Sequence, residues 1–131
     1  MSGYLLDTNH ASRLVRRREP LRARLLVRPF DFHLCPIVLA EVRHGLTRKN
    51  LHKFLAEWER LSTRFAWLPI DWDDAARAAD LQTAQERRGR QLELPDALIA
   101  AVALRHDLTL LTADRDFEGV PGLRIENWLA A

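Results

Sequence analysis

Short apolar runs alternate with longer, helix-like segments along this chain, and this alternation restricts the fold more than any other feature of the sequence. The runs lie at residues 4–6, 31–35, 66–70, 108–112 and 123–126, and each is short enough to be a buried strand. Strands that are separated by helices pair most readily in parallel, with helices packed on both faces of the sheet. We therefore expect an α/β fold built on a central, mostly parallel sheet.

The segments between the runs carry helix signals of several kinds. Two short helices with a basic outer face are expected after Asp7, separated at Pro20. Proline fits the first turn of a helix and glycine its end, so Pro36 is expected to open a helix that stops at Gly45. The other helices are expected over residues 51–65, 71–88 and 94–103, the last of them apolar nearly all round and therefore buried.

The length and composition fit a single domain over residues 1–131, because 47% hydrophobic residues are enough to build a core. Cys35 is the only cysteine, which excludes an intrachain disulfide and a site of clustered thiolates. Its apolar neighbours predict a small buried side chain. The sequence has no signal-peptide pattern and no apolar segment of the ~20 residues that span a bilayer, so a soluble, cytoplasmic protein is expected.

The positive charge of the chain is almost entirely arginine, since only Lys49 and Lys53 are lysines. The formal net charge is +2, and gathering several carboxylates in one site would leave the rest of the chain strongly positive. The planar guanidinium group suits phosphate oxygens, which favours a phosphate-bearing partner; a solvated charged surface is the alternative for any single arginine. The candidates to bind the phosphate backbone of such a partner are Arg13, Arg16, Arg17, Arg87, Arg88 and Arg90.

Acidic residues recur where strands end. Asp7 closes the first run, Asp114 follows the fourth run by two residues, and Asp96 opens the buried helix that leads into the fourth run. In a parallel sheet these positions lie at or near one edge, and Glu41 joins them if its helix begins at the same edge. Each residue also has an ordinary structural explanation as a helix cap, a surface residue, a helix-dipole partner or a turn former.

Carboxylates that gather at one edge repel each other unless a cation lies between them. An all-oxygen ligand set selects hard ions such as Mg²⁺ or Mn²⁺ rather than Zn²⁺. Such a site suits phosphodiester hydrolysis, in which the ion polarises the phosphate and activates a water. The sequence therefore predicts a magnesium-dependent phosphodiesterase centre.

Four segments carry a resemblance to a known family: residues 5–9 (LLDTN), 40–45 (AEVRHG), 95–101 (PDALIAA) and 111–123 (LTADRDFEGVPGL). In this order they resemble PIN-domain proteins, specifically the VapC-type toxins of VapBC toxin–antitoxin systems. The resemblance implies a three-layer α/β/α PIN fold and a Mg²⁺-dependent endoribonuclease. It also implies inhibition by a small VapB-type antitoxin, homodimerisation and higher-order toxin–antitoxin complexes.

By position, Asp7, Glu41 and Asp96 match the first three acidic residues of the family. The fourth is open between two residues: many relatives have Asn where Asp114 stands and place their last Asp immediately before Phe, as Asp116 is here. Asp114 is favoured as the metal ligand, and Asp116 is kept as an alternative catalytic acid. Three further residues resemble polar groups that orient carboxylates or water: Thr8, Asn9 and Thr112.

Other enzyme classes fit the sequence less well. A phosphatase with an aspartyl nucleophile needs a second Asp where Asn9 stands, and a receiver domain needs a lysine at a strand end that neither Lys49 nor Lys53 provides. The histidines have no metal-ligand spacing and the serines no nucleophile elbow; His10 alone is near enough to Asp7 to touch the rim of the site. A non-catalytic PIN-like module that binds RNA or a protein is the remaining alternative.

Overall fold

Five parallel strands form the centre of the molecule, in the order β3-β2-β1-β4-β5. The computed structural model describes residues 3–16 and 21–129. The middle strand β1 (Tyr4–Leu6) pairs with β2 (Phe32–Leu34) and β4 (Thr109–Leu111), and β3 (Ala66–Trp67) and β5 (Ile125–Glu126) form the edges. Every pairing is parallel, so the predicted α/β class and parallel sheet are confirmed.

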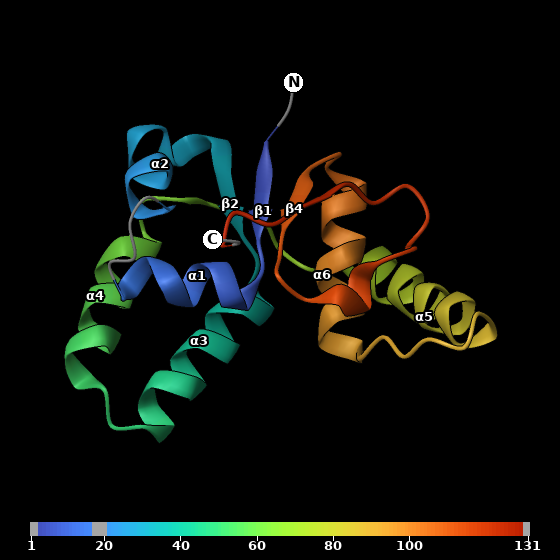
Figure 1. Cartoon of the computed structure of the whole chain (residues 1–131), viewed down its shortest axis with the longest axis horizontal. Coiled ribbons are helices and arrows are strands. Elements are labelled where there is room, and N and C mark those ends of the chain that lie inside the picture. The colour runs from blue at the N-terminus through green and yellow to red at the C-terminus, as the bar shows by residue number, and fades with distance from the viewer. Residues whose placement is uncertain (1–2, 17–20, 130–131) are drawn as a thin grey trace.

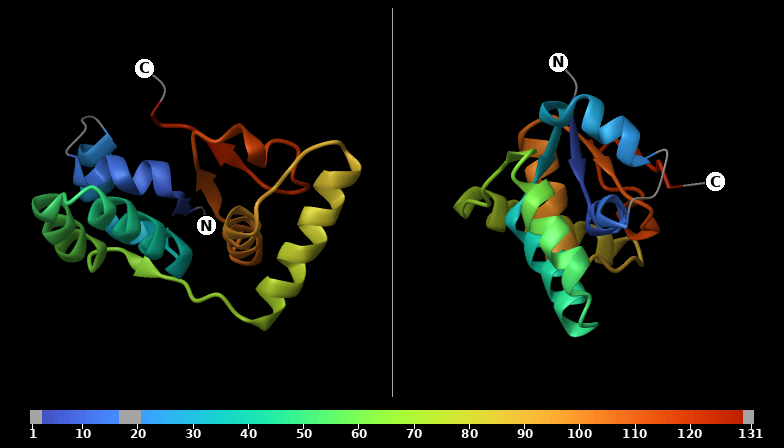
Figure 2. Two further views of the ribbon diagram at one scale, coloured as in Figure 1. Left: turned by 90° about the horizontal axis from the view of Figure 1, so that it is seen from below. Right: turned by 90° about the vertical axis from the view of Figure 1, so that its left-hand side faces the viewer.

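Helices cover the sheet from two sides. Figure 1 shows α1, α3 and α4 on one side of the strands and α5 and α6 on the other, and the views in Figure 2 agree. The helices are α1 (Thr8–Val15), α2 (Leu21–Val27), α3 (Pro36–Arg48), α4 (His52–Ser62), α5 (Trp72–Arg87) and α6 (Leu94–Arg105), with short 3₁₀ turns η1 (Pro29–Asp31) and η2 (Arg115–Phe117). The predicted three-layer α/β/α arrangement is therefore confirmed.

Several predicted element ends were wrong. The helix that Pro36 opens does not stop at Gly45 but continues to Arg48. Val38, Val42 and Leu46 recur every four residues and are all buried, so the packing of Leu46 carries the helix past the glycine. The strand expected over 66–70 has only two residues, and the helix expected over 51–65 ends at residue 62. The predicted end of α5 is confirmed, because Gly89 follows the helix with a φ of +73°.

The core is formed largely by the strands and by α6. This helix lies between the sheet and α5, and residues 99–103 are completely buried, which explains its apolar surface on nearly every side. Cys35 is buried as predicted, and burial raises the pKa of its thiol to about 11. Within the described part of the chain, no helix has the length and apolar character required to cross a membrane.

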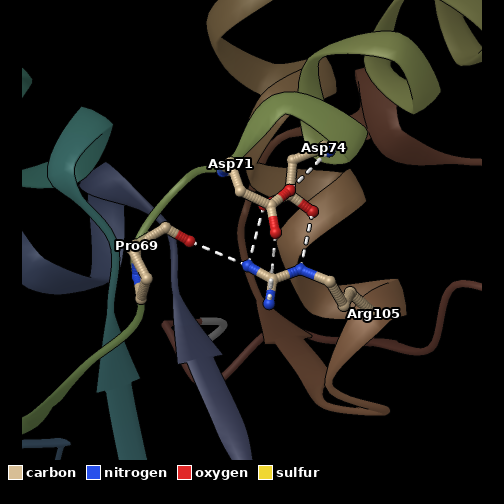
Figure 3. A network of polar contacts seen from close by, with 4 residues as sticks. All are labelled: Pro69, Asp71, Asp74 and Arg105. Atoms are coloured by element: carbon tan, nitrogen blue, oxygen red, sulfur yellow. Dashed lines mark hydrogen bonds and ion pairs between the residues drawn. The ribbon is translucent and has the colours of Figure 1, made fainter.

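Arg105, at the end of α6, joins three elements (Figure 3). Its Nε and Nη2 donate to the two carboxylate oxygens of Asp74, each at 2.8 Å, and Nη2 also donates to the carbonyl of Pro69 at 2.9 Å. Asp74 in turn forms a reciprocal capping box with Asp71 at the start of α5. Because the Asp74 side chain is only 2% exposed, this network fixes the orientation of α6, whose opposite end carries Asp96.

Candidate metal centre

Asp7 lies where β1 ends and α1 begins. Its backbone N–H donates to the carbonyl of Leu111 at 3.0 Å, which continues the pairing of β1 with β4 by one residue. Its carboxylate caps α1 by accepting from the Thr8 N–H at 2.8 Å, so the helix-cap role predicted as an alternative is real. The residue is only 4% exposed, and burial raises its pKa; hydrogen bonds from Thr112 and Thr8 oppose this, and repulsion from Glu41 and Asp114 reinforces it.

Two polar side chains hold the second oxygen of Asp7. The Thr112 hydroxyl donates to Oδ2 at 2.7 Å, and the Asn9 amide donates to the same atom at 3.2 Å. The Thr112 oxygen also accepts from the backbone N–H of Asp114 at 3.0 Å. Of the three residues predicted to orient carboxylates or water, Asn9 and Thr112 therefore contact Asp7 through their side chains, across more than 100 residues of sequence in the case of Thr112.

Glu41 reaches the same region from α3. This helix begins two residues after β2, so its first turns lie at the carboxyl edge of the sheet. Val38 and Val42 face the core while Glu41 is exposed, and its Oε1 accepts a hydrogen bond of 2.6 Å from the Thr8 hydroxyl. Thr8 thus links the two acids, through its backbone to Asp7 and through its side chain to Glu41.

Asp96, Asp114 and Asp116 form the tightest group of carboxylates. One oxygen from each residue lies within 4.8 Å of the others. The pKa of Asp96 is raised to about 7, chiefly by burial and then by repulsion from Asp7, Asp114, Glu41 and Asp116. All five acids singled out in the sequence therefore act on one another at one place in the fold.

The loop after β4 holds both candidates for the fourth acid. The side chain of Asp114 accepts from the N–H of Asp116 at 2.8 Å and so caps the 3₁₀ turn η2. Asp114 is half-buried and raises the pKa of both Asp7 and Asp96, whereas Asp116 is exposed. Both belong to the cluster, and the central position of Asp114 favours it as the ligand.

Two of the arginines predicted to bind RNA also hold the acidic loop. Arg88 donates to the carbonyl of Gly119, and Arg90 donates to the carbonyl of Arg115 at 2.8 Å. Gln85 adds a bond of 3.1 Å to the carbonyl of Glu118. Because the contacts join residues 25 or more positions apart, no local sequence signal could have indicated them.

The other predicted arginines are more accessible. Arg13 and Arg87 are exposed, and Arg16, also exposed, lies with its guanidinium 5.7 Å from the centre of the Phe54 ring. Arg17 lies outside the described residues.

His10, which is near enough to Asp7 in sequence to touch the rim of the site, is fully buried. It lies on the inner face of α1 together with Ala11, Leu14 and Val15, a spacing of one, four and five residues that the sequence does contain. Burial, and then the charge of Arg13, lowers its pKa to about 4, so the ring is neutral at pH 7.

The donor set of this centre fits a hard divalent cation. All the charged groups are carboxylates, and burial together with their mutual repulsion raises the pKa of Asp96 to about 7. A divalent ion among them would relieve that repulsion and accept oxygen ligands, which Mg²⁺ and Mn²⁺ prefer.

Comparison with known proteins agrees with this geometry. A family model described as PIN domain matches residues 4–123. The chain is 32% identical to ribonuclease VapC21 of Mycobacterium tuberculosis, with 98% of this chain and 94% of the relative covered. It is 29% identical to the tRNA(fMet)-specific endonuclease VapC of Salmonella typhimurium, with 98% and 99% covered.

Solved structures show the same relationship. The chain superimposes on a chain of the DNA-bound VapBC complex from Salmonella typhimurium with a TM-score of 0.86 at 27% identity, covering 98% of this chain and 99% of the other. It shares its fold with a chain of the VapBC2 complex from Rickettsia felis bound to a promoter DNA fragment, with a TM-score of 0.84 at 24% identity and the same coverage. The chain therefore belongs to the PIN-domain family and, within it, to the VapC-type toxins. This membership makes it an endoribonuclease of a family whose nucleases use a divalent metal.

Proposed function

We propose that this protein is a Mg²⁺-dependent endoribonuclease that acts as the toxin of a type II toxin–antitoxin pair. Asp7, Glu41, Asp96 and Asp114 are the residues proposed to hold the ion, with Asp116 as an additional catalytic acid beside them. The observation that carries the proposal is the meeting of the acids at one edge of the sheet, where one oxygen each of Asp96, Asp114 and Asp116 lies within 4.8 Å of the others. Mn²⁺ is the alternative ion, since it accepts the same oxygen ligands.

The side chains around the ion site have separate tasks in this proposal. When bound, the ion supplies the polarisation of the phosphate and the lowered pKa of a water. Thr112 and Asn9 fix Oδ2 of Asp7, and the Thr8 N–H fixes Oδ1, so the carboxylate cannot rotate away from the site. The Thr8 hydroxyl holds Glu41 in the same way. The expected products carry a 5′-phosphate and a 3′-hydroxyl, as the family resemblance implies.

RNA is proposed to cross the basic surface near this edge. Arg13, Arg16 and Arg87 are the exposed candidates for phosphate contacts, so binding is expected to weaken as salt is raised. The Salmonella relative is named for tRNA(fMet), which makes initiator tRNA the first substrate to test.

The expected partners of the protein are an antitoxin and a second copy of the chain. Solved relatives are VapBC complexes, which supports a VapB-type antitoxin and an assembly larger than the toxin alone. We also infer that residues 1–131 form one PIN domain, that two copies form a homodimer, and that the pair acts in the cytoplasm. A small antitoxin gene beside this one would be expected.

The test compares the wild type with Asp7→Asn. Asparagine is also a good helix cap, so the variant should fold while it loses a ligand charge. Asp80→Asn, on the exposed surface of α5, is the matched control. Purified proteins are incubated with tRNA in Mg²⁺ or in EDTA, and growth is measured when each is expressed without antitoxin.

We expect metal-dependent cleavage and growth arrest for the wild type and the control only. RNA binding by the wild type without cleavage of any RNA would instead identify a non-catalytic PIN-like module. Full toxicity of Asp7→Asn would show that Asp7 is not part of the ion site.

A further inference from the structure

A buried histidine connects the ion site to the C-terminal segment. The His10 ring has no exposed surface, and both of its nitrogens are within hydrogen-bond distance of a polar partner. Nδ1 lies 2.7 Å from Oδ1 of Asn9, and Nε2 lies 3.0 Å from the backbone nitrogen of Trp128. In Figure 1 the C-terminal segment passes across the strands toward α1.

The partners determine the direction of each bond. The Ala113 N–H can only donate, and it lies 3.2 Å from Oδ1 of Asn9. The amide nitrogen of Asn9 must therefore point toward Asp7. Oδ1 can then only accept from His10, which places the ring proton on Nδ1. The Trp128 N–H can only donate, so Nε2 accepts. A single neutral tautomer satisfies every group in this chain of bonds.

Trp128 is itself held in place by aromatic and charged neighbours. Its ring packs edge-on against Tyr4 at 4.9 Å and Phe32 at 5.6 Å, measured between ring centres. The Arg24 guanidinium lies 3.5 Å from the centre of the ring, and the indole N–H donates to Glu126 at 2.9 Å. The backbone N–H that meets His10 therefore comes from a fixed point rather than a free tail.

We propose that His10 is a positioning residue, which uses Trp128 as its anchor to hold Asn9 and, through Asn9, the carboxylate of Asp7 and the start of the acidic loop. Among the described residues, the Asn9 side chain makes four polar contacts, with Asp7, Thr112, Ala113 and His10, and the one with His10 leads away from the ion site. Without that bond the Asn9 side chain can rotate, and Asp7 loses one of the two donors to Oδ2. This inference rests on the proposed ion site.

Groups that orient a metal ligand typically contribute 10- to 100-fold to affinity or activity. His10→Phe fills a similar volume but makes neither bond, so it should weaken Mn²⁺ binding and lower kcat, each by about tenfold. His10→Gln offers one donor and one acceptor and should recover most of both. The KM for RNA should change much less than kcat, because the ring is buried and cannot touch substrate.

The experiment measures Mn²⁺ binding by calorimetry, steady-state cleavage of tRNA, and the free energy of unfolding for the full chain and its variants. His106→Phe, on an exposed histidine at the end of α6, is the matched control. A purely structural role would lower stability without changing Mn²⁺ affinity per folded molecule. Wild-type affinity and kcat in folded His10→Phe would overturn the proposal.

Two further outcomes keep the test decisive. If His10→Phe does not fold, nitrogen NMR of the wild-type His10 ring decides, because the proposal requires the proton on Nδ1 and a proton on Nε2 would overturn it. If the wild type binds Mn²⁺ but cleaves no RNA, the proposed function fails, while the comparison of Mn²⁺ affinities still tests His10.

Discussion

Replacing Asp96 by Asn should stabilise the metal-free protein, although it removes a ligand. The pKa of Asp96 rises from 3.8 to about 7 in the folded chain, through burial and the repulsion of four neighbouring acids. Taken at face value, this pKa difference means that the ionised Asp96 lowers the free energy of unfolding by about 4 kcal/mol. Because the side chain keeps part of its surface in water, the variant is expected to regain about half of this free energy. The lost charge in the first turn of α6 subtracts ~0.5 kcal/mol from the gain. The net gain should be about 1.5 kcal/mol.

The gain depends on pH in a defined direction. The unfolded chain releases the Asp96 proton near pH 3.8, whereas the folded chain keeps it until about pH 7. Between these values Asp96 binds its proton in the folded state and not in the unfolded state, so its contribution to the free energy of unfolding of the wild type falls as pH rises and levels off above pH 7. The advantage of the variant should therefore be close to zero at about pH 4 and complete at about pH 8.

Urea denaturation in EDTA at the two pH values measures this difference, with Asp80→Asn as the control for loss of an exposed carboxylate. Adding Mg²⁺ should stabilise the wild type more than Asp96→Asn, because only the wild type has the full ligand set. An Asp96→Asn protein that is no more stable than the wild type at pH 8 in EDTA would refute the carboxylate repulsion on which the ion site rests.

Three other outcomes follow from the contacts. Arg105→Met should lower the free energy of unfolding by about 2 kcal/mol, because it leaves the buried Asp74 carboxylate without two hydrogen bonds; thermal and urea unfolding would measure it. Arg90→Met should leave the salt dependence of RNA binding unchanged and weaken Mn²⁺ binding, since its guanidinium holds the carbonyl of Arg115; a shallower salt dependence would show that it contacts RNA. Cys35, with a pKa of about 11, should resist a thiol reagent at pH 8 until the protein is unfolded in urea.

The sheet and the meeting of the acids could be predicted because both follow from local patterns. Apolar runs of three to five residues locate the strands, and an acidic residue after such a run must lie at the edge where parallel strands end. Asp7 and Asp114 are placed by this rule alone. Asp96 and Glu41 also needed the helix starts at Pro95 and Pro36, which proline indicates well.

What could not be predicted depends on contacts between distant segments. Gly45 has the sequence character of a helix end, but the burial of Leu46 one residue later decides otherwise. The sequence around Arg88 and Arg90 predicts a basic surface. Only the fold shows that carbonyl groups 25 or more positions away accept hydrogen bonds from these two arginines. The partner of His10 is a backbone N–H 118 residues further along the chain, which no side-chain pattern encodes.

These long-range contacts have a common physical reason. The five carboxylates repel each other, and four of them help to raise the pKa of Asp96; the repulsion would push the loop and the helices apart when no cation is present. The acids come from four places, and three of these places are held by groups outside the cluster. His10 and Thr112 hold the end of β1, the arginines after α5 hold the acidic loop, and Arg105 fixes the far end of α6. A site held in this way keeps its ligands in position before the ion arrives, so binding costs little rearrangement. The same rigidity predicts that removing any one of these supports weakens metal binding even though no ligand is lost.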